Sequence, residues 1–503
     1  MTTDLRRDDV RLAVRGSAAN YLAALLQAAI FIFHTAAARL FGRSAYGAYI
    51  FAWSTIEIGN KIALCGLDKG AMRAVATSRA RRDPEGERQS IGTALRGVAL
   101  AGAVVFAGIL VLARPIADVW GAAGYAPVLR ALAPLVWLWT GMMVLVTATM
   151  ATRTMRYNLL VRGLADPLFM IAAIGLYALL WRSGGGLAIA TAHATAAVGT
   201  FAVACYAVHR VFGLGRVVSA AVRTPVEWSL ISFSVPVGLA EVFNQAIYRA
   251  DVLVVAMVLK DAGQVASYGA CLLLAETVSS IRYAFDPIFS PLVAETTVSG
   301  DRARLAGNLQ TLVRWVTLVT VPVFLAIAVF GDQLLTLWGS GYREAFPALT
   351  VLAVAHLVNA ILGLHQWAVV MSGHSRLDLL NNAIAFVVAL ALALLLVPRA
   401  GLVGAAVATL AANVVFRLLQ AIETWYLLHV HALSRAWLKV CVAAGVSAAV
   451  QVGVRTLAPL HGWAALGIGT LAGLACYNAA LFGLGLAAEE WQVLGRLLGR
   501  RSS

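Results

Sequence analysis

Charged side chains are scarce in this chain: they make up only 13% of the 503 residues, whereas 61% are apolar. A water-soluble protein carries far more charge on its surface, so lipid must cover much of this one. Long polar segments are also missing, since the longest runs only from about residue 72 to residue 89. No connection is therefore large enough to hold a soluble catalytic domain.

Cysteine and phosphate-binding glycine motifs are scarce as well. The five cysteines lie in or beside apolar stretches, and no two have the spacing of a metal site. The glycine run at residues 184–186 lacks the Lys-Ser/Thr that follows in an ATP-binding loop. The sequence predicts neither a metal nor a cofactor, and it argues against direct ATP hydrolysis.

The chain is instead built from long apolar stretches, of which a membrane-spanning helix needs about 20 residues. The sequence predicts 14 of them, beginning near residues 18, 45, 92, 129, 158, 186, 236, 265, 312, 346, 377, 401, 436 and 463. Runs such as 99–113 and 383–397 are continuous, unlike the alternating strands of a membrane β-barrel. We therefore predict an all-α integral membrane protein.

Basic residues outnumber acidic ones by 39 to 24. When the chain is threaded through 14 spans, most Lys and Arg fall on the side that holds both termini, most densely at residues 6–15 and 69–88. The positive-inside rule then places both termini in the cytoplasm. Because these residues are dispersed over helix ends and not gathered into one stripe, no nucleic-acid partner is expected.

A sequence repeat organises the chain. Ala45-Tyr46-Gly47-Ala48 matches Ser267-Tyr268-Gly269-Ala270. Further matches follow in the same order at offsets of 215 to 222: 119–125 with 337–342, 158–160 with 378–380, and 186–187 with 401–402. Six spans separate the copies, so both have the same orientation in the membrane. The repeat predicts an N-terminal six-helix lobe (1–220), a second six-helix lobe (221–430), and two additional helices with a tail (431–503).

Several short motifs give the chain a family resemblance. They are Tyr46-Gly47, Gly66-Leu67-Asp68-Lys69-Gly70, Arg249-Ala250-Asp251, 265–269, 287–291 and 338–342. Together they resemble O-antigen flippase-type polysaccharide transporters within the multidrug/oligosaccharidyl-lipid/polysaccharide (MOP) exporter superfamily, over roughly residues 10 to 430. Because no loop is long enough to hold a catalytic domain, we expect that the protein is not an enzyme. The resemblance implies translocation of an undecaprenyl-diphosphate-linked glycan across the cytoplasmic (inner) membrane by alternating access, with membrane lipids and the polysaccharide polymerase and assembly machinery as partners.

Three alternatives remain open beside this resemblance. A multidrug extruder would share the fold, but a mid-membrane arginine would repel cationic drugs. A peptidoglycan-precursor flippase would have the same number of spans and a cationic cavity. A polysaccharide polymerase or ligase would need a large periplasmic loop, and the sequence has none.

Polar residues inside the predicted spans are candidates for the substrate path, because ionisable groups in the membrane normally face a cavity or a partner. Glu241, Gln245 and Arg249 are spaced by four and so share one helix face. Arg249 suits an anionic diphosphate, and the alternative is a permanent pair with a carboxylate. The other predicted cavity residues are Asn244, Asp251, Gln27, His34, Asn413 and Arg417.

Three further carboxylate and lysine positions are candidates for ion coupling: Glu57, Lys61 and Glu276. Glu57 and Lys61 are four residues apart and can instead neutralise each other on one helix. Asp68, Lys69 and Arg73 lie at the cytoplasmic mouth of the second span. They are predicted to form a gate, with an ordinary basic flank as the alternative.

Overall fold

The computed structural model describes residues 30–119, 124–152, 154–283, 302–432, 435–458 and 462–485, together with 285, 286, 289, 293 and 296. Within these residues every regular element is a helix, which confirms the all-α fold class. Ten of the described helices are long and apolar enough to cross a membrane. One of them runs from Arg376 to Leu428 across a kink, so the predicted count of 14 spans stays a prediction.

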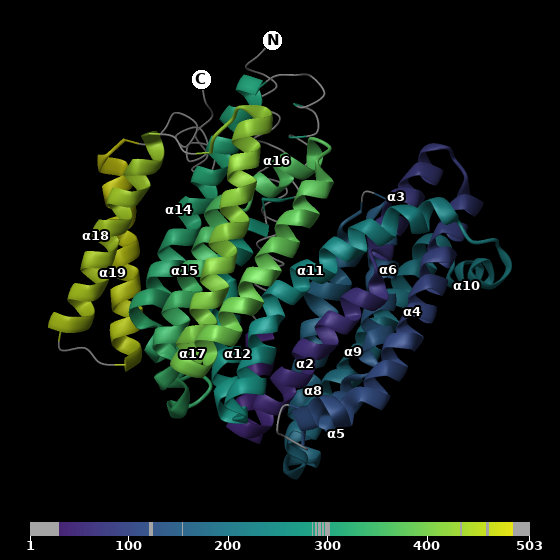
Figure 1. The fold of residues 1–503 in the computed structure, drawn as a ribbon, viewed down its shortest axis with the longest axis horizontal. Helices are drawn as coiled ribbons and strands as arrows, with labels where there is room; N and C mark the ends of the chain where they lie inside the picture. The colour runs from purple at the N-terminus through teal and green to yellow at the C-terminus, as the bar shows by residue number, and fades with distance from the viewer. Residues whose placement is uncertain are drawn as a thin grey trace. The chain divides into compact units, whose positions relative to one another are not determined.

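The chain forms two compact units (Figure 1). The larger unit comprises Arg15–Ala270 and Asp378–Ala412, and the smaller unit comprises Cys271–Leu377 and Asn413–Ser503. This division follows contacts, whereas the predicted boundaries at residues 220 and 430 follow the sequence repeat, and those boundaries stay a prediction.

The larger unit holds the helices of the N-terminal half and parts of α12 and α17. Their bounds are Ile30–Phe41, α2 Arg43–Leu64, α3 Leu67–Ala80, α4 Pro84–Val119, α5 Tyr125–Leu132, α6 Leu135–Met150, α7 Arg156–Asn158, η1 Leu159–Ala165, α8 Asp166–Leu180, η2 Arg182–Gly184, α9 Gly185–Phe212, α10 Leu214–Arg223, α11 Trp228–Leu259, α12 Ala262–Tyr283 and α17 Ser375–Leu428. The smaller unit takes the rest of α12 and α17, with α14 Arg302–Leu335, η3 Ser340–Ala345, α15 Phe346–Leu362, α16 His365–Met371, α18 Arg435–Leu457 and α19 Gly462–Gly483.

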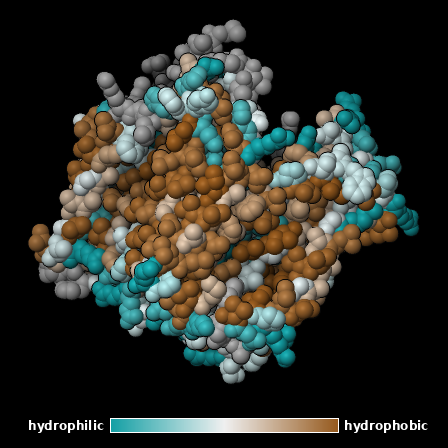
Figure 2. All heavy atoms as spheres, in the orientation of Figure 1, coloured by the Kyte–Doolittle hydropathy of each residue, from teal (hydrophilic) through white to brown (hydrophobic). Residues whose placement is uncertain are grey.

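Small and aliphatic residues make the core of the larger unit. Ile91, Leu145, Ala204, Val208 and Val217 lie in one buried cluster that joins α4, α6, α9 and α10. Alanine and glycine at helix contacts let backbones approach closely, which is how helices pack in lipid. Hydrophobic residues also spread widely over the visible surface of each unit (Figure 2). Such a surface fits a protein that lipid surrounds.

The two sequence repeats share an unusual backbone geometry. Gly185 has φ 55° and ψ −130°, and Gly401 has φ 53° and ψ −131°. Only glycine adopts this region without strain. The two residues are separated by an offset of 216, within the range of the sequence matches, although the sequence comparison paired Gly401 with Gly186. In the second repeat this glycine divides the long helix α17 into two parts.

The Gly66–Gly70 motif forms a corner that packs directly on α11. Gly66 has a φ of 71° and links α2 to α3. Its backbone lies against the backbone of Ser234 and Gly238, and Gly238 in turn lies against the backbone of Cys65. A side chain at either glycine would overlap main-chain atoms, so the motif holds α2, α3 and α11 at contact distance.

We predict that Gly238→Ala lowers the stability of the protein, because its Cβ would overlap the Cys65 carbonyl group. Overpacking of this kind costs about 1–3 kcal/mol. Gly108→Ala is the matched control, since a Cβ there meets no atom within 4 Å. Thermal unfolding in detergent should show a lower midpoint for Gly238→Ala only, and equal midpoints would contradict the close packing of this corner.

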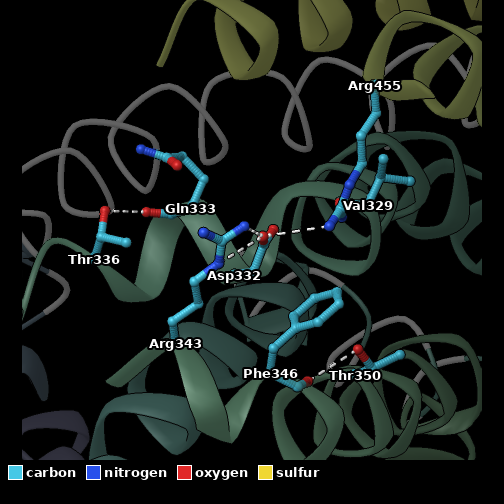
Figure 3. Close-up of polar contacts among 8 residues, drawn as sticks. All are labelled: Val329, Asp332, Gln333, Thr336, Arg343, Phe346, Thr350 and Arg455. Atoms are coloured by element: carbon cyan, nitrogen blue, oxygen red, sulfur yellow. Dashed lines mark hydrogen bonds and ion pairs between the residues drawn. The ribbon is translucent and has the colours of Figure 1, made fainter. Parts of the chain in front are cut away.

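In the smaller unit, one carboxylate joins α18 to α14. Asp332, near the end of α14, accepts hydrogen bonds from Arg343 at 3.1 Å (Nε) and 2.6 Å (Nη2), and Nη2 of Arg455 lies 3.3 Å away (Figure 3). Arg455 comes from α18 and also donates to the carbonyl oxygen of Val329. The Asp332 carboxylate is therefore one of the contacts that attach α18 to the rest of this unit, beside the apolar cluster that Val440 and Tyr477 form with α14.

Replacement of Asp332 by Asn should lower the free energy of unfolding by about 1 kcal/mol, and with it the unfolding midpoint. The loss is modest because both arginines are partly solvated. Asp118→Asn, at an exposed position of α4, is the control and should leave the midpoint unchanged. If both variants unfold like the parent protein, the Asp332 contacts do not hold α18 in place.

Candidate functional site

Five charged residues link α2 and α3 to α11 in the larger unit, and we call them the charged ladder: Glu57, Lys61, Lys69, Glu241 and Arg249. The side chains of Arg249 and Glu57 form an ion pair, with Nη2 of Arg249 3.4 Å from Oε1 of Glu57. Nζ of Lys61 lies 2.8 Å from Oε2 of Glu241, and Lys69 pairs with the other oxygen of the same carboxylate. The ladder therefore ties α11 to two preceding helices.

The pairing follows from helix periodicity. Glu57 and Lys61 are one turn apart on α2, and Glu241 and Arg249 are two turns apart on α11. The two helices are matched in reverse order, so the later residue of α2 meets the earlier residue of α11. Each of the two residues has a partner on α11, so a local pair between Glu57 and Lys61 is not needed to neutralise them. The carboxylate partner of Arg249 comes from α2.

The ladder is partly buried and carries an excess of positive charge. Its side chains are 17% to 45% exposed, with the Arg249–Glu57 pair the most enclosed. Three basic groups face two carboxylates, which leaves one net positive charge. Charges inside an apolar helix are costly unless they are paired or line a polar path. The arrangement can thus hold an anion that competes with the carboxylates for the basic groups.

The residues beside the ladder have different surroundings. Nδ2 of Asn244 donates to Oδ1 of Asn382 on α17 at 3.1 Å. Gln245 is half-buried on α11. Gln27 and most of the 287–291 motif lie outside the described residues. The predicted role of these residues in the substrate path stays a prediction.

Asp251 and His34 lie in two buried polar clusters that the repeat relates. The Asp251 carboxylate accepts hydrogen bonds from Tyr268 at 2.8 Å and Thr409 at 2.9 Å. In the first repeat, Nδ1 of His34 lies 3.0 Å from the Tyr46 hydroxyl, and Nδ1 of His193 lies 2.9 Å from the Tyr49 hydroxyl. Tyr46 and Tyr268 are the repeat pair noted in the sequence, and Thr409 follows His193 by 216 positions. The first cluster joins the helix Ile30–Phe41, α2 and α9, and the second joins α11, α12 and α17.

The predicted gate residues join the ladder or pack beside it. Lys69 binds Glu241, and the Arg73 guanidinium lies 4.4 Å from the ring centroid of Phe233 on α11. Asp68 is buried, and burial raises the pKa of its carboxyl group, although neighbouring Lys69 opposes this shift. The residues that follow the end of α2 are therefore in contact with α11. The predicted gating function of Asp68, Lys69 and Arg73 stays a prediction.

Glu276, Asn413 and Arg417 belong to the smaller unit. Arg417 is only 1% exposed, donates to the side-chain oxygens of Gln420 at 2.7 Å and Gln366 at 3.3 Å, and stacks on Phe416. Asn413 is buried, and Glu276 is half-buried on α12. The many contacts of Arg417 give it a packing role in this unit, and its predicted substrate contact stays a prediction.

One contact between helices, made by Arg43, was not predicted from the sequence. Nε of Arg43 donates to the carbonyl oxygen of Gly263 at 3.1 Å, and its Nη2 donates to Ser267 at 2.8 Å. Nearby, Gly47 lies directly against the backbone of Ala262. These contacts join the starts of α2 and α12, the two helices that begin with the repeated Tyr-Gly. A basic residue shortly before the first Tyr-Gly motif was the feature of the sequence that could have indicated this contact.

Comparison with known proteins places the chain in a family. Residues 36–347 match the model of a family described as polysaccharide biosynthesis protein. Since this match covers more than half of the chain, the protein belongs to that family. No curated protein sequence matches the chain.

Solved structures share its fold. The lipid II flippase MurJ, in an inward closed conformation, has a TM-score of 0.69 at 13% identity, covering 94% of this chain and 99% of its own. An inward-facing multidrug resistance MATE family transporter of the MOP superfamily has a TM-score of 0.61 at 15% identity, covering 82% of this chain and 95% of its own. A MOP transporter from Pyrococcus furiosus, described by the reverse polarity of its binding pocket, has a TM-score of 0.59 at 13% identity, covering 83% and 95%. The chain is thus a multi-pass membrane protein with the MOP fold, and the resemblance is confirmed.

The charged ladder can be tested by exchanging its charges. We expect Glu57→Arg alone and Arg249→Glu alone to lower the unfolding midpoint, because each places two like charges together between α2 and α11. The double exchange should restore much of the loss, with a coupling free energy of about 0.5–3 kcal/mol. Strictly additive effects in thermal unfolding of the full-length protein would argue against a direct pair.

Proposed function

We propose that this protein translocates a lipid-linked oligosaccharide, an undecaprenyl-diphosphate-linked glycan, across the cytoplasmic membrane by alternating access. The family description supports a role in polysaccharide biosynthesis. The fold similarity to a lipid II flippase covers nearly the whole chain, more than the 82% reached by the multidrug transporter. Both kinds of neighbour are transporters or flippases, which is consistent with a protein that is not an enzyme.

The charged ladder is the observation that carries this proposal. A diphosphate needs cationic partners, and guanidinium groups match phosphate oxygens in a bidentate manner. Arg249, Lys61 and Lys69 already face carboxylates, so an incoming diphosphate can replace Glu57 or Glu241 as their partner. The exchange keeps the basic groups paired, and it loosens the contact between α2 and α11 at the same time. Binding and conformational change would thus be coupled through the same side chains.

The lipid part of the substrate needs no polar site. In the proposed cycle the charged head enters the path beside the ladder, while the prenyl chain stays among the apolar helix surfaces and in the bilayer. The repeat gives the protein two related halves that can move against each other, as in other transporters with parallel repeats. Both termini and the mouth of α2 would face the cytoplasm.

A peptidoglycan precursor is the second candidate substrate. It is favoured by the similarity to the lipid II flippase, and it also presents a diphosphate to the ladder. Export of cationic drugs is less well supported, because the ladder has a net positive charge. The two diphosphate substrates differ in their sugars, so lipid analysis distinguishes them.

The decisive experiment compares variants in a strain that lacks the gene. Arg249→Ala should fail to complement, so that lipid-linked oligosaccharide accumulates on the cytoplasmic face, whereas Arg249→Lys should restore part of the flux. Arg114→Ala, at an exposed position of α4, is the matched control and should complement fully. The lipids are extracted and identified by mass spectrometry, and their sidedness is measured with a membrane-impermeant glycosidase. An unchanged pool of every lipid-linked glycan in the deletion strain would refute the proposal.

A further inference from the structure

The junction of α9 and α10 forms a pocket of about 540 Å³ with a basic lining. Arg88 reaches it from α4, His209 from the last turn of α9, and Arg216 from the first turn of α10. Phe212 and the backbone of Gly213 complete the wall. Among the described residues, none that lines the pocket is acidic, so its chemistry suits an anion.

Two carboxylates that shortly precede Arg88 in the chain are engaged elsewhere. Asp83 accepts hydrogen bonds from the backbone N–H groups of Glu85 at 3.1 Å and Gly86 at 2.9 Å. Glu87 faces Arg79, 4.0 Å away. Over the described part of the chain, the three basic side chains of the pocket form no ion pair. They remain available to an external anion.

Beside the pocket, α10 has an exposed apolar side. Val217 is fully buried against the core, and Gly92 of α4 lies directly against the backbone of Ala221, so α10 is firmly seated on α4. Val218 and Val222 are one turn apart on the outside and are 51% and 77% exposed. In Figure 1, α10 lies at the edge of the larger unit beside α4.

The exposed apolar side of α10 indicates that this helix lies at a membrane surface. A short helix with valines on its outer face and arginines beside them is typical of helices that lie in the lipid headgroup layer. Trp228, which begins α11 five residues after α10 ends, is 73% exposed. Tryptophan is enriched at this depth of the membrane. These features fit a pocket that opens at the level of the lipid headgroups.

We propose that this pocket binds the phosphate headgroup of an anionic phospholipid. Arg88, His209 and Arg216 would hold the phosphodiester, and the acyl chains would run along Val218 and Val222 into the bilayer. Basic groups near the leaflet on the predicted cytoplasmic side attract anionic lipid. None of these residues belongs to the charged ladder, so this site does not depend on which molecule the protein transports.

The test uses the full-length protein in detergent with added lipid. Phosphatidylglycerol should raise the unfolding midpoint more than phosphatidylcholine does, and soluble glycerol phosphate should have no such effect. In the double variant Arg88→Gln/Arg216→Gln, binding of phosphatidylglycerol should weaken about 30-fold, because this is the affinity that two basic residues at a membrane surface usually contribute. Native mass spectrometry counts the bound lipid directly.

Two further variants make the result specific. Arg114→Gln, which removes an exposed arginine elsewhere on α4, should keep the preference for phosphatidylglycerol. The double variant Arg88→Lys/Arg216→Lys retains both charges and should keep most of the preference for phosphatidylglycerol. It therefore tests the role of charge even if the glutamine variant folds poorly. Equal stabilisation of the parent protein by both lipids, or an unchanged preference in the glutamine variant, would overturn the proposal. Equal stabilisation by glycerol phosphate would show a soluble-phosphate site and would also overturn it.

Discussion

The ion pairs between the antiparallel helices α2 and α11 are the constraint that fixes how these two helices meet in the larger unit. Glu57, Lys61, Glu241 and Arg249 lie on apolar helices, where charged groups are costly unless they are paired or line a polar path, and here each has a partner of opposite charge. Their pairing sets the register of α2 against α11, and the glycine contacts at Gly66 and Gly238 then allow the two backbones to touch. Lys69 extends the same contact into α3. Charge pairing and close glycine packing therefore act together at this corner.

Sequence duplication explains a second level of organisation. Gly185 and Gly401 keep the same unusual backbone angles, although the residues around them differ. The buried polar clusters keep the tyrosine but change its partner, from His34 in the first repeat to Asp251 in the second. Backbone geometry that only glycine can adopt is hard to replace, whereas a hydrogen-bonding partner can be exchanged for another. The two halves therefore remain alike in fold while differing in local charge.

The fold was predictable from the sequence because its signals are local. Apolar stretches of spanning length, short connections and an ordered repeat predict an all-α membrane protein without any knowledge of contacts. The site was predictable only in part. Glu241 and Arg249 were recognised from their shared helix face, but the partner of Arg249 lies 192 positions earlier in the chain. Helical spacing alone favoured the local Glu57–Lys61 pair, because a sequence shows the neighbours on one helix and not the helix that packs against it.

The intermediate burial of the ladder suits the opening and closing that the proposed transport cycle requires. An ion pair exposed to water contributes little, about 0–1 kcal/mol, and would hold neither state. A fully buried pair costs about 3–5 kcal/mol to break, because a desolvated charge is left behind. The Arg249 and Glu57 side chains are 17% and 19% exposed, whereas Lys69, at the mouth of α2, is 45% exposed. The pairs therefore become easier to break from Arg249 toward Lys69. An anion that arrives at Lys69 meets the weakest contact first. In the proposed cycle, opening would then proceed from Lys69 inward, with each basic group passing from a carboxylate to the ligand without being left unpaired.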